Sequence, residues 1–318
     1  MKPDSSPPTD LASSDRPTLP RRRVGRRRRL DGSRLAGWLF VAPALLMYGL
    51  FVLQPLFLTI QYSFYDWDGV GPGEWVGFAN YARVFTDPDL IGPIVNSFRL
   101  LIFFSVIPVT LGVVAASLIH RIASSRFGST ATTVIFLPQV IPLVASGIIW
   151  GWLLARPGIV NQVLEAIGLG GIARAWLGDF GTALPAVGMI GIWVLLGFCT
   201  VLLQTGMAKI NPELYEAARL DGAGWWAELR AVTLPGIKYE IGVCLTVTAI
   251  AALAAFDIVY VSTGGGPGRA TSVPGIKIYI EAFLQRRVGL ASALAVALVL
   301  LVLVVILPVQ RLTREDST

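Results

Sequence analysis

The distribution of apolar residues along this chain divides it into six long hydrophobic segments separated by polar stretches. The segments span residues 37–61, 98–119, 133–154, 183–203, 241–261 and 290–307. A helix needs about 20 apolar residues to cross the roughly 30 Å hydrocarbon core of a bilayer. The pattern therefore predicts an all-α integral membrane protein with six transmembrane helices.

The first segment contains Pro43 and Pro55, which membrane helices tolerate because neighbouring groups satisfy the freed carbonyls. It is longer than the roughly 7 to 15 apolar residues of a signal peptide and has no clear cleavage site. We therefore expect it to remain in the mature protein as the first helix.

Composition excludes an ordinary soluble protein. Hydrophobic residues make up 54% of the chain and charged residues only 14%, whereas soluble domains carry about 25% charged residues. Cys199 and Cys244 lie inside apolar segments, and His120, the one histidine, follows the end of another. These positions predict neither a disulfide framework nor a metal site, and we expect no cofactor.

The net charge of +6 arises largely from one tail, because residues 21–34 contain eight arginines. We expect residues 1–34 to form a disordered basic tail, since they contain few apolar residues. Arginines just ahead of a first span hold the N-terminus in the cytoplasm and attract anionic lipid headgroups. The tail thus indicates membrane topology rather than nucleic-acid binding.

Six crossings place both termini on the same side of the membrane. With the N-terminus in the cytoplasm, 18 of the 26 Lys and Arg residues fall inside and eight outside, the bias that the positive-inside rule requires. We expect a six-helix membrane domain over residues 35–311 and a short cytoplasmic tail over 312–318. Residues 206–240 then form the longest cytoplasmic loop, which is too long for a simple connection.

This loop predicts a pair of short helices. Asn211 followed by Pro212 is a helix start, because Asn caps free amides and Pro suits the first helical position. The helix should end near Asp221 and Gly222, since Gly adopts the backbone conformation that ends helices. A second helix should run over 224–232 and stop before Leu234 and Pro235.

Small residues mark one face of the first loop helix. Ala217 and Ala218 let another backbone approach closely, and an amphipathic helix in a partner's groove is a recurrent mode of recognition. Residue chemistry alone leaves a second interpretation open, in which the helix rests on lipid or packs under its own bundle.

The loop sequence resembles the EAA motif of permease subunits of bacterial ABC importers. Glu216-Ala217-Ala218 is followed at the motif's spacing by Gly222 and then by Val232-Thr233-Leu234-Pro235, with Val232 where Ile is usual. Asp221 before Gly222 is similar to the carbohydrate-uptake branch, the maltose and glycerol-3-phosphate type. SFYDWDG, WVGFANYARVF, LPQVIPLVASGIIWGWLLARPGIVNQVL and STGGGPGRAT also resemble that branch, so the likeness extends over residues 34–311.

The resemblance implies a type I ABC importer permease in a bacterial cell membrane. Such a permease pairs with a second, similar permease, receives substrate from an extracytoplasmic binding protein, and docks on a dimeric ATPase. By the same resemblance Glu216 makes polar contacts with the ATPase, Ala217 and Ala218 pack closely against it, and Gly222 provides the turn. Asp221, Leu234 and Pro235 complete the expected coupling site.

The chain is not predicted to be an ATPase. None of its four lysines follows a glycine, so the phosphate-binding sequence GxxxxGK[ST] is absent. The glycine-rich run GGGPG, which includes Gly265, Gly266 and Pro267, lies in a predicted external loop. We interpret it as a tight turn or a contact with the binding protein.

Several polar or aromatic residues within spans are candidates for the substrate pathway, since a sugar needs hydrogen-bonding groups and an aromatic surface. These candidates are Gln139, Ser146, Trp150, Thr246 and Asp257. Ordinary hydrogen bonds between helices explain the same residues equally well, and Asp257 has the alternative of reaching the headgroups.

Other functions are less consistent with the sequence. A stand-alone secondary transporter predicts paired intramembrane charges or an inverted repeat, and the chain contains neither. A permease for another small solute remains an alternative, and the sugar itself is not identified. An intramembrane enzyme lacks a suitable constellation of residues.

Overall fold

The computed structural model describes residues 31–122 and 125–313, and these are mostly helical. Within those ranges the strands are limited to β1 (Tyr65–Asp66) and β2 (Glu74–Trp75), which pair antiparallel. The predicted all-α class is therefore confirmed. Most of the predicted N-terminal tail, 1–30, and residues 314–318 of the C-terminal tail lie outside the described residues.

The chain forms two compact units that divide after Gln54. The first contains α1 (Asp31–Tyr48), which continues as the π-helical segment Gly49–Leu53. The helix thus begins a few residues before the boundary expected at residue 34. None of the residues from Trp38 to Leu53 is buried, which is typical of a membrane helix that contacts lipid or other chains.

The remaining helices carry the rest of the fold. In chain order they are α2 (Gln54–Tyr62), α3 (Ala79–Thr86), α4 (Pro88–Leu101), α5 (Ile107–His120), α6 (Arg126–Val140), α7 (Leu143–Leu153), α8 (Ile159–Ala166), α9 (Ala183–Met207), α10 (Pro212–Leu220), α11 (Trp225–Glu228), α12 (Leu234–Gly236), α13 (Lys238–Leu253), α14 (Asp257–Thr263), α15 (Pro274–Tyr279) and α16 (Val288–Leu312). Short π-helical segments, Ile102–Val106, Leu229–Thr233 and Ile280–Leu284, continue α4, α11 and α15, and Gly170–Ile172 is a 3₁₀ turn.

Length and hydropathy identify the helices that can cross a membrane. Four described stretches qualify without a break, namely Trp38–Tyr62, Pro88–His120, Ala183–Met207 and Val288–Leu312. Two further pairs qualify only when joined across a bend, α6 with α7 and Trp225–Gly236 with α13. Counting each pair as one crossing gives up to six, the number predicted. In the second pair the predicted apolar span begins within α13, and Trp225–Gly236 belongs to the predicted loop 206–240.

The third predicted helix, 133–154, is wrong as an unbroken segment. Pro142 forces the residue before it out of the helical region, and Ile141 accordingly has an extended backbone with φ −76° and ψ 128°. The chain turns there by 97° between α6 and α7. The fifth predicted helix, 241–261, is also interrupted, because α13 ends at Leu253 and α14 begins only at Asp257.

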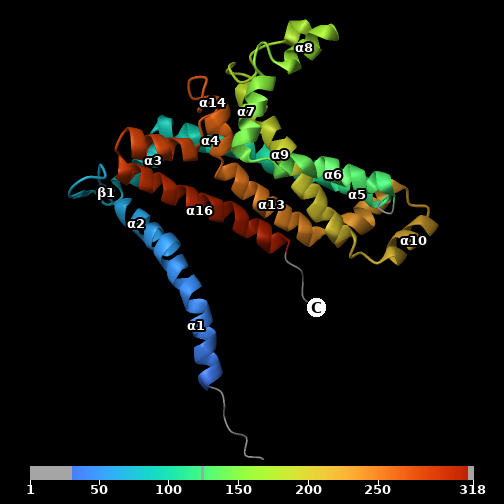
Figure 1. Cartoon of the computed structure of the whole chain (residues 1–318), viewed down its shortest axis with the longest axis horizontal. Helices are drawn as coiled ribbons and strands as arrows, with labels where there is room; N and C mark the ends of the chain where they lie inside the picture. The colour runs from blue at the N-terminus through green and yellow to red at the C-terminus, as the bar shows by residue number, and fades with distance from the viewer. Residues whose placement is uncertain (1–30, 123–124, 314–318) are drawn as a thin grey trace, which may run out of the picture. The chain divides into compact units, whose positions relative to one another are not determined.

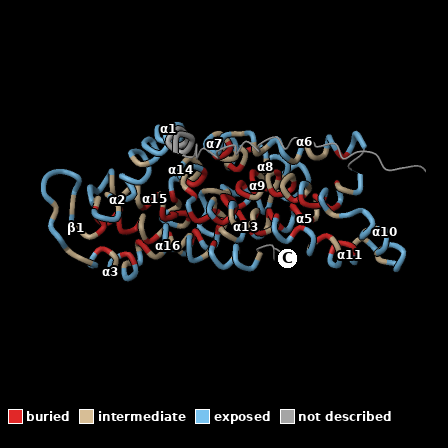
Figure 2. The backbone as a smooth tube through the Cα atoms, turned by 90° about the horizontal axis from the view of Figure 1, so that it is seen from below, coloured by how far each residue is buried: buried red, intermediate tan, exposed pale blue. Residues whose placement is uncertain are grey.

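The core of the second unit lies around α9, which packs against α5, α6 and α13 (Figure 1). The buried residues are concentrated in α5, α9 and α13 (Figure 2), whereas Gly128 is the one buried residue of α6. Glycines make the close approaches possible, since a Cβ at Gly197 would lie 2.4 Å from the carbonyl oxygen of Ile135. Small residues serve this purpose at helix interfaces in membranes.

Candidate functional site

The loop between α9 and α13 contains the helix pair predicted from the sequence. Its first helix, α10, begins at Pro212, and the Asn211 side chain accepts a hydrogen bond of 3.1 Å from the amide of Glu213. Glu213 lies in the first turn, where the helix dipole favours an acid. The predicted start of this helix is confirmed.

The outer face of α10 exposes apolar surface. Leu214 is 54% exposed and Leu220 is 89% exposed, and between them Glu216 and Ala217 are exposed while Ala218 is half-buried. Exposed apolar groups that gather on one short element mark an interaction surface. Trp226 of α11, also exposed, adds to the apolar surface of the loop.

Gly222 ends α10 in the way that the sequence predicted. Its φ of +80° lies in the left-handed region, and the amides of Gly222 and Ala223 donate to the carbonyls of Arg219 and Ala218 at 3.0 and 2.9 Å. This pair of bonds is a Schellman cap. No neighbouring atom lies within 4 Å of a Cβ added at Gly222, so the backbone conformation alone favours glycine here.

The sequence predicts that the second helix stops before Leu234 and Pro235, and this prediction is wrong. Helical structure runs from Trp225 to Gly236, through the π-helical turn Leu229–Thr233. The wider π turn gives the Leu234 amide a partner in the Leu229 carbonyl and relieves the clash that a proline ring makes in a regular helix. The chain then bends by 75° into α13.

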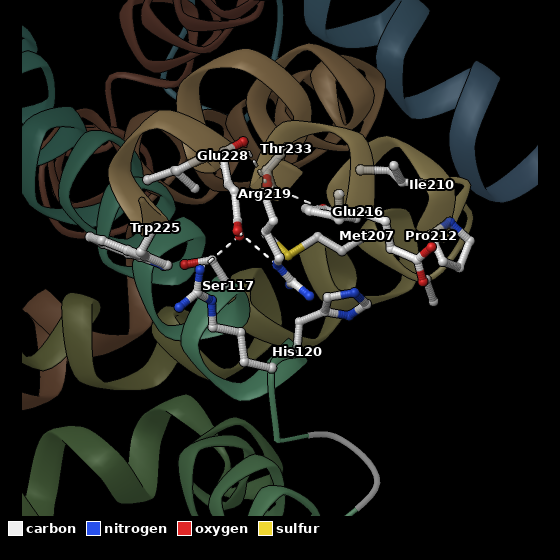
Figure 3. Close-up of a pocket in the computed structure, with 14 residues that line it drawn as sticks. Ser117, His120, Met207, Ile210, Pro212, Glu216, Arg219, Trp225, Glu228 and Thr233 are labelled. Carbon is white, nitrogen blue, oxygen red and sulfur yellow. Dashed lines mark hydrogen bonds and ion pairs between the residues drawn. The ribbon is translucent and has the colours of Figure 1, made fainter. Parts of the chain in front are cut away.

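A buried carboxylate connects the two loop helices to the end of α5. Glu228 of α11 is only 4% exposed. Its Oε1 accepts a hydrogen bond of 2.9 Å from Nε of Arg219, on α10, and its Oε2 accepts one of 2.7 Å from Nη2 of Arg121, which caps α5. Figure 3 shows the Glu228 carboxylate lying between the two contacts.

The arginines also determine the charge of this group, which lies in the loop outside the apolar spans. Burial raises the pKa of Glu228, but the hydrogen bonds and charges of Arg219 and Arg121 outweigh that effect and hold the pKa below its ordinary value. The carboxylate is therefore ionised at neutral pH. Removal of either arginine would destabilise the protein, because it would leave the buried carboxylate with less compensating charge.

A pocket of about 270 Å³ lies beside this ion network, between the ends of α5 and α9 and the helix α10 (Figure 3). His120 and Tyr215 both line this pocket, and their ring centroids are 5.9 Å apart. The Tyr215 hydroxyl lies 3.1 Å from the Thr233 hydroxyl. Glu216 lines the same pocket. The pocket places Glu216, one of the expected coupling residues, next to the ends of α5 and α9.

The structure separates the five substrate-pathway candidates. Gln139 and Asp257 line one cavity of about 490 Å³ at the break between α6 and α7. Thr246 lines a different cavity, with Tyr239 and Gln310. Gln139 and Asp257 are therefore brought together, and Thr246 is not part of their cavity.

The other two candidates pack inside the protein. Ser146 is fully buried, and Trp150 stacks edge-on against Trp193 with ring centroids 5.6 Å apart. Gln139 Oε1, Ser146 Oγ, Trp150 Nε1 and Thr246 Oγ1 are all shielded from solvent without a hydrogen-bond partner among the described residues.

The glycine-rich loop between α14 and α15 is a tight turn. Gly264, Gly265 and Gly268 have positive φ, and the Gly266–Pro267 peptide is cis. Gly265 is buried and Gly266 and Pro267 are half-buried, so the exposed tip is formed by the next two residues, Gly268 and Arg269.

Asn96 of α4 holds this loop in place. Its amide nitrogen donates to the carbonyls of Ala270 and Ser272 at 3.1 and 3.0 Å, and the side chain is buried. Asn161 has a similar role after α7, where it donates to the carbonyl of Arg174 at 2.8 Å and accepts from Trp176 Nε1 at 2.9 Å. Both asparagines order loops that leave the apolar spans.

Sequence reasoning missed Glu228, Arg121 and Arg219 as a functional group. Arg219 and Glu228 lie nine positions apart on different helices, and Arg121 and Glu228 are 107 positions apart. No local spacing brings them together, so only the packing of α5 beneath the loop reveals the network.

Comparison with known proteins gives consistent matches. Residues 108–314 match the model of a family described as "Binding-protein-dependent transport system inner membrane component". The chain is 33% identical over 276 residues to YurN, a probable ABC transporter permease protein of Bacillus subtilis, covering 86% of this chain and 94% of YurN. It is 33% identical over 313 residues to NgcF, a diacetylchitobiose uptake system permease protein of Streptomyces coelicolor, covering 93% and 88%.

Solved structures agree on the fold. A bacterial ABC transporter involved in the import of the acidic polysaccharide alginate contains a chain that matches with a TM-score of 0.77 at 24% identity, covering 90% of this chain and 99% of that one. At this identity the likeness establishes the helical architecture alone.

Proposed function

This chain belongs to the family of inner membrane components of binding-protein-dependent transport systems, and from that premise we propose that it is the permease subunit of an ATP-driven importer for a sugar or sugar derivative. In this proposal it pairs with a second permease, docks on a dimeric ATPase and receives solute from an extracytoplasmic binding protein. The observation that carries the proposal is the exposed helix α10, with its EAA-type sequence and its capped end at Gly222.

We assign the docking surface for the ATPase to α10. Ala217 presents a small, exposed side chain between the exposed Leu214 and Leu220, so a groove on a partner can approach the helix backbone closely. Glu216, exposed beside them, supplies polar contacts. Asp221, Gly222, Leu234 and Pro235 shape the turn and the following helix that hold α10 in this orientation.

We assign ATP hydrolysis to a separate subunit. The sequence has no GxxxxGK[ST] loop, the element with which many ATPases hold phosphate, and family members are transport components rather than hydrolases. The chain's own contribution is to move its spans when the docked ATPase moves α10.

The substrate class rests on the relatives. NgcF is named for uptake of diacetylchitobiose, and SmoG of Agrobacterium fabrum, 32% identical over 272 residues, for transport of sulfoquinovosyl glycerol. We propose that the solute passes the cavity lined by Gln139 and Asp257, because a sugar needs such hydrogen-bonding groups. We place Ser146 and Trp150, on α7 beyond the break, next to this route, and leave Thr246 outside it.

We propose a multi-pass orientation with both termini and the loop 206–240 in the cytoplasm of a bacterium. The excess of Lys and Arg on that side supports it. The chain then comprises a basic cytoplasmic tail over 1–34, a permease domain over 35–311 and a short tail over 312–318. Gly265, Gly266 and Pro267 fall on the outer side, where they support a tip that faces the binding protein.

The proposal is tested by purifying the tagged chain gently from its native membranes and identifying its partners. Co-purification of an ATPase and a second permease is expected, and the reconstituted complex should take up labelled diacetylchitobiose or starch-derived oligosaccharides only with ATP and a binding protein. A chain that purifies alone and moves solute without ATP would instead be a secondary transporter. ATP-driven uptake of a solute that is not a sugar would leave the permease assignment intact but overturn the substrate class.

A further inference from the structure

The ion network around Glu228 is not accounted for by the docking surface on α10. Glu228 lies between the two parts of the EAA-type motif, six residues after Gly222, and its side chain is buried. A buried carboxylate costs free energy unless partners compensate it. Its placement therefore requires an explanation beyond the exposed contact with an ATPase.

The two partners of Glu228 come from different parts of the protein. Arg219 is in the last turn of α10, the helix that is proposed to move with the ATPase. Arg121 follows the last residue of α5, at the end of the continuous apolar stretch Pro88–His120. The Glu228 carboxylate therefore binds α10 through one oxygen and the end of α5 through the other.

α5, the span that Arg121 caps, packs into the core of the protein. α5 packs along α9 and touches α13, and the preceding π segment contributes Phe104, which lines the same cavity as Gln139 and Asp257. A displacement at Arg121 thus acts on a rigid element that extends to the proposed solute route. Charge-assisted hydrogen bonds are about twice as strong as neutral ones, which suits them to carry such a displacement.

We infer that Glu228 is a positioning residue that transmits the movement of α10 to α5. The inference rests on the proposed function, because it requires a docked ATPase that moves α10. Glu228 does not itself touch the ATPase in this scheme. It keeps α10, α11 and the end of α5 moving as one body.

The variant Glu228→Gln tests this, because it removes the charge and keeps the size of the side chain. The measurement uses the co-purified complex in vesicles with a single added thiol, Ala254→Cys, on an exposed residue lining the cavity. Cys199 and Cys244 are buried and give little background. The probe is a water-soluble maleimide, whose reaction rate is compared with and without ATP.

In the parent complex we expect ATP to change the labelling rate of Cys at position 254 by about tenfold, within the roughly 5- to 150-fold range of common couplings between sites. In Glu228→Gln the ATPase should still co-purify and hydrolyse ATP, but the labelling rate should no longer respond. Arg230→Gln is the matched control, because Arg230 is exposed on the same helical run and has no ion pair in the described structure. It should retain the full response.

Two results with Glu228→Gln would overturn the inference. A full ATP response in Glu228→Gln would show that the network does not transmit movement, and loss of the ATPase from that complex would show that Glu228 shapes the docking surface instead. If Glu228→Gln fails to accumulate, Arg219→Lys keeps the charge without the Nε donor and should reduce the response. An unchanged response there would also overturn it. Failure of the proposed function itself looks different, since the parent complex then lacks an ATPase.

Discussion

Arg219 and Glu228 meet across the turn that joins α10 to α11, with Nε of the arginine 2.9 Å from Oε1 of the glutamate. Between them the chain reverses at Gly222, whose φ is +80°. The geometry of this one glycine therefore determines both the direction of the exposed helix and the contact that joins it to the rest of the loop.

Substitution of Gly222 should disable the loop without unfolding the spans. Because the space around it is open, the penalty for Gly222→Ala is the left-handed backbone, about 1–2 kcal/mol. A β-branched residue such as valine should abolish ATP-driven uptake while the protein still reaches the membrane. Gly222→Asn should retain more activity, since Asn tolerates this conformation.

Gly224 offers the matched control for the turn. It also has open space around it, but its φ is −77°, so Gly224→Ala should leave uptake close to that of the parent. Equal effects of alanine at the two positions would contradict the assignment of the turn.

Enlarging the small face of α10 should block docking. Ala217→Leu adds bulk to an exposed position, so the permease should still accumulate and fold, but the amount of ATPase that co-purifies should fall at least about tenfold, equivalent to roughly 1.4 kcal/mol. Ala166→Leu, an exposed position on α8, outside the loop between α9 and α13, should have no effect. Undiminished recovery of ATPase with Ala217→Leu would move the docking surface elsewhere.

Asn96→Asp should loosen the loop after α14. The Asn96 amide nitrogen donates to the carbonyls of Ala270 and Ser272. A carboxylate oxygen in its place has no hydrogen to donate and repels the two carbonyl oxygens, at a cost of about 1–3 kcal/mol. We expect binding-protein-stimulated ATP hydrolysis to fall while hydrolysis without the binding protein stays constant. Stimulation equal to that of the parent would argue against a role of this loop in docking.

Gln139→Leu should impair passage of solute rather than coupling. The substitution removes a polar atom that is shielded from solvent, has no hydrogen-bond partner within residues 31–122 and 125–313, and belongs to a residue lining the cavity at the α6–α7 break. Uptake should fall while co-purification of the ATPase and its ATP hydrolysis persist. Thr133→Val, on an exposed turn of α6, serves as the control. If both variants transport normally, the solute passes elsewhere.

The Glu228 network should resist mild acid. Its arginines hold the pKa of Glu228 below the ordinary value of 4.5, so the ion pairs contribute fully above that value and are lost as the pH falls through the lowered pKa. Amide hydrogen exchange in α10 and α11, corrected for intrinsic rates, should stay constant from about pH 8 to about pH 5 and rise only in stronger acid. Glu228→Gln should show faster exchange throughout and no such step.

Local chemistry made much of the loop predictable. The cap at Asn211 and the turn at Gly222 each depend on residues within a few positions, so the sequence predicted the first helix and both its ends. It did not predict that the second helix continues through Leu234 and Pro235, because the π turn that accommodates the proline depends on packing.

The sequence by itself determined the membrane class, the apolar spans and the family motif, because those depend on composition and on short-range spacing. Only the tertiary structure decided where the spans break and which polar groups meet. Gln139 and Asp257 share a cavity while Thr246 does not, and Arg121 reaches Glu228 across 107 positions. Such contacts arise when helices that are far apart in the sequence pack side by side. The apolar pattern of a membrane helix does not indicate which residue its last side chain will contact.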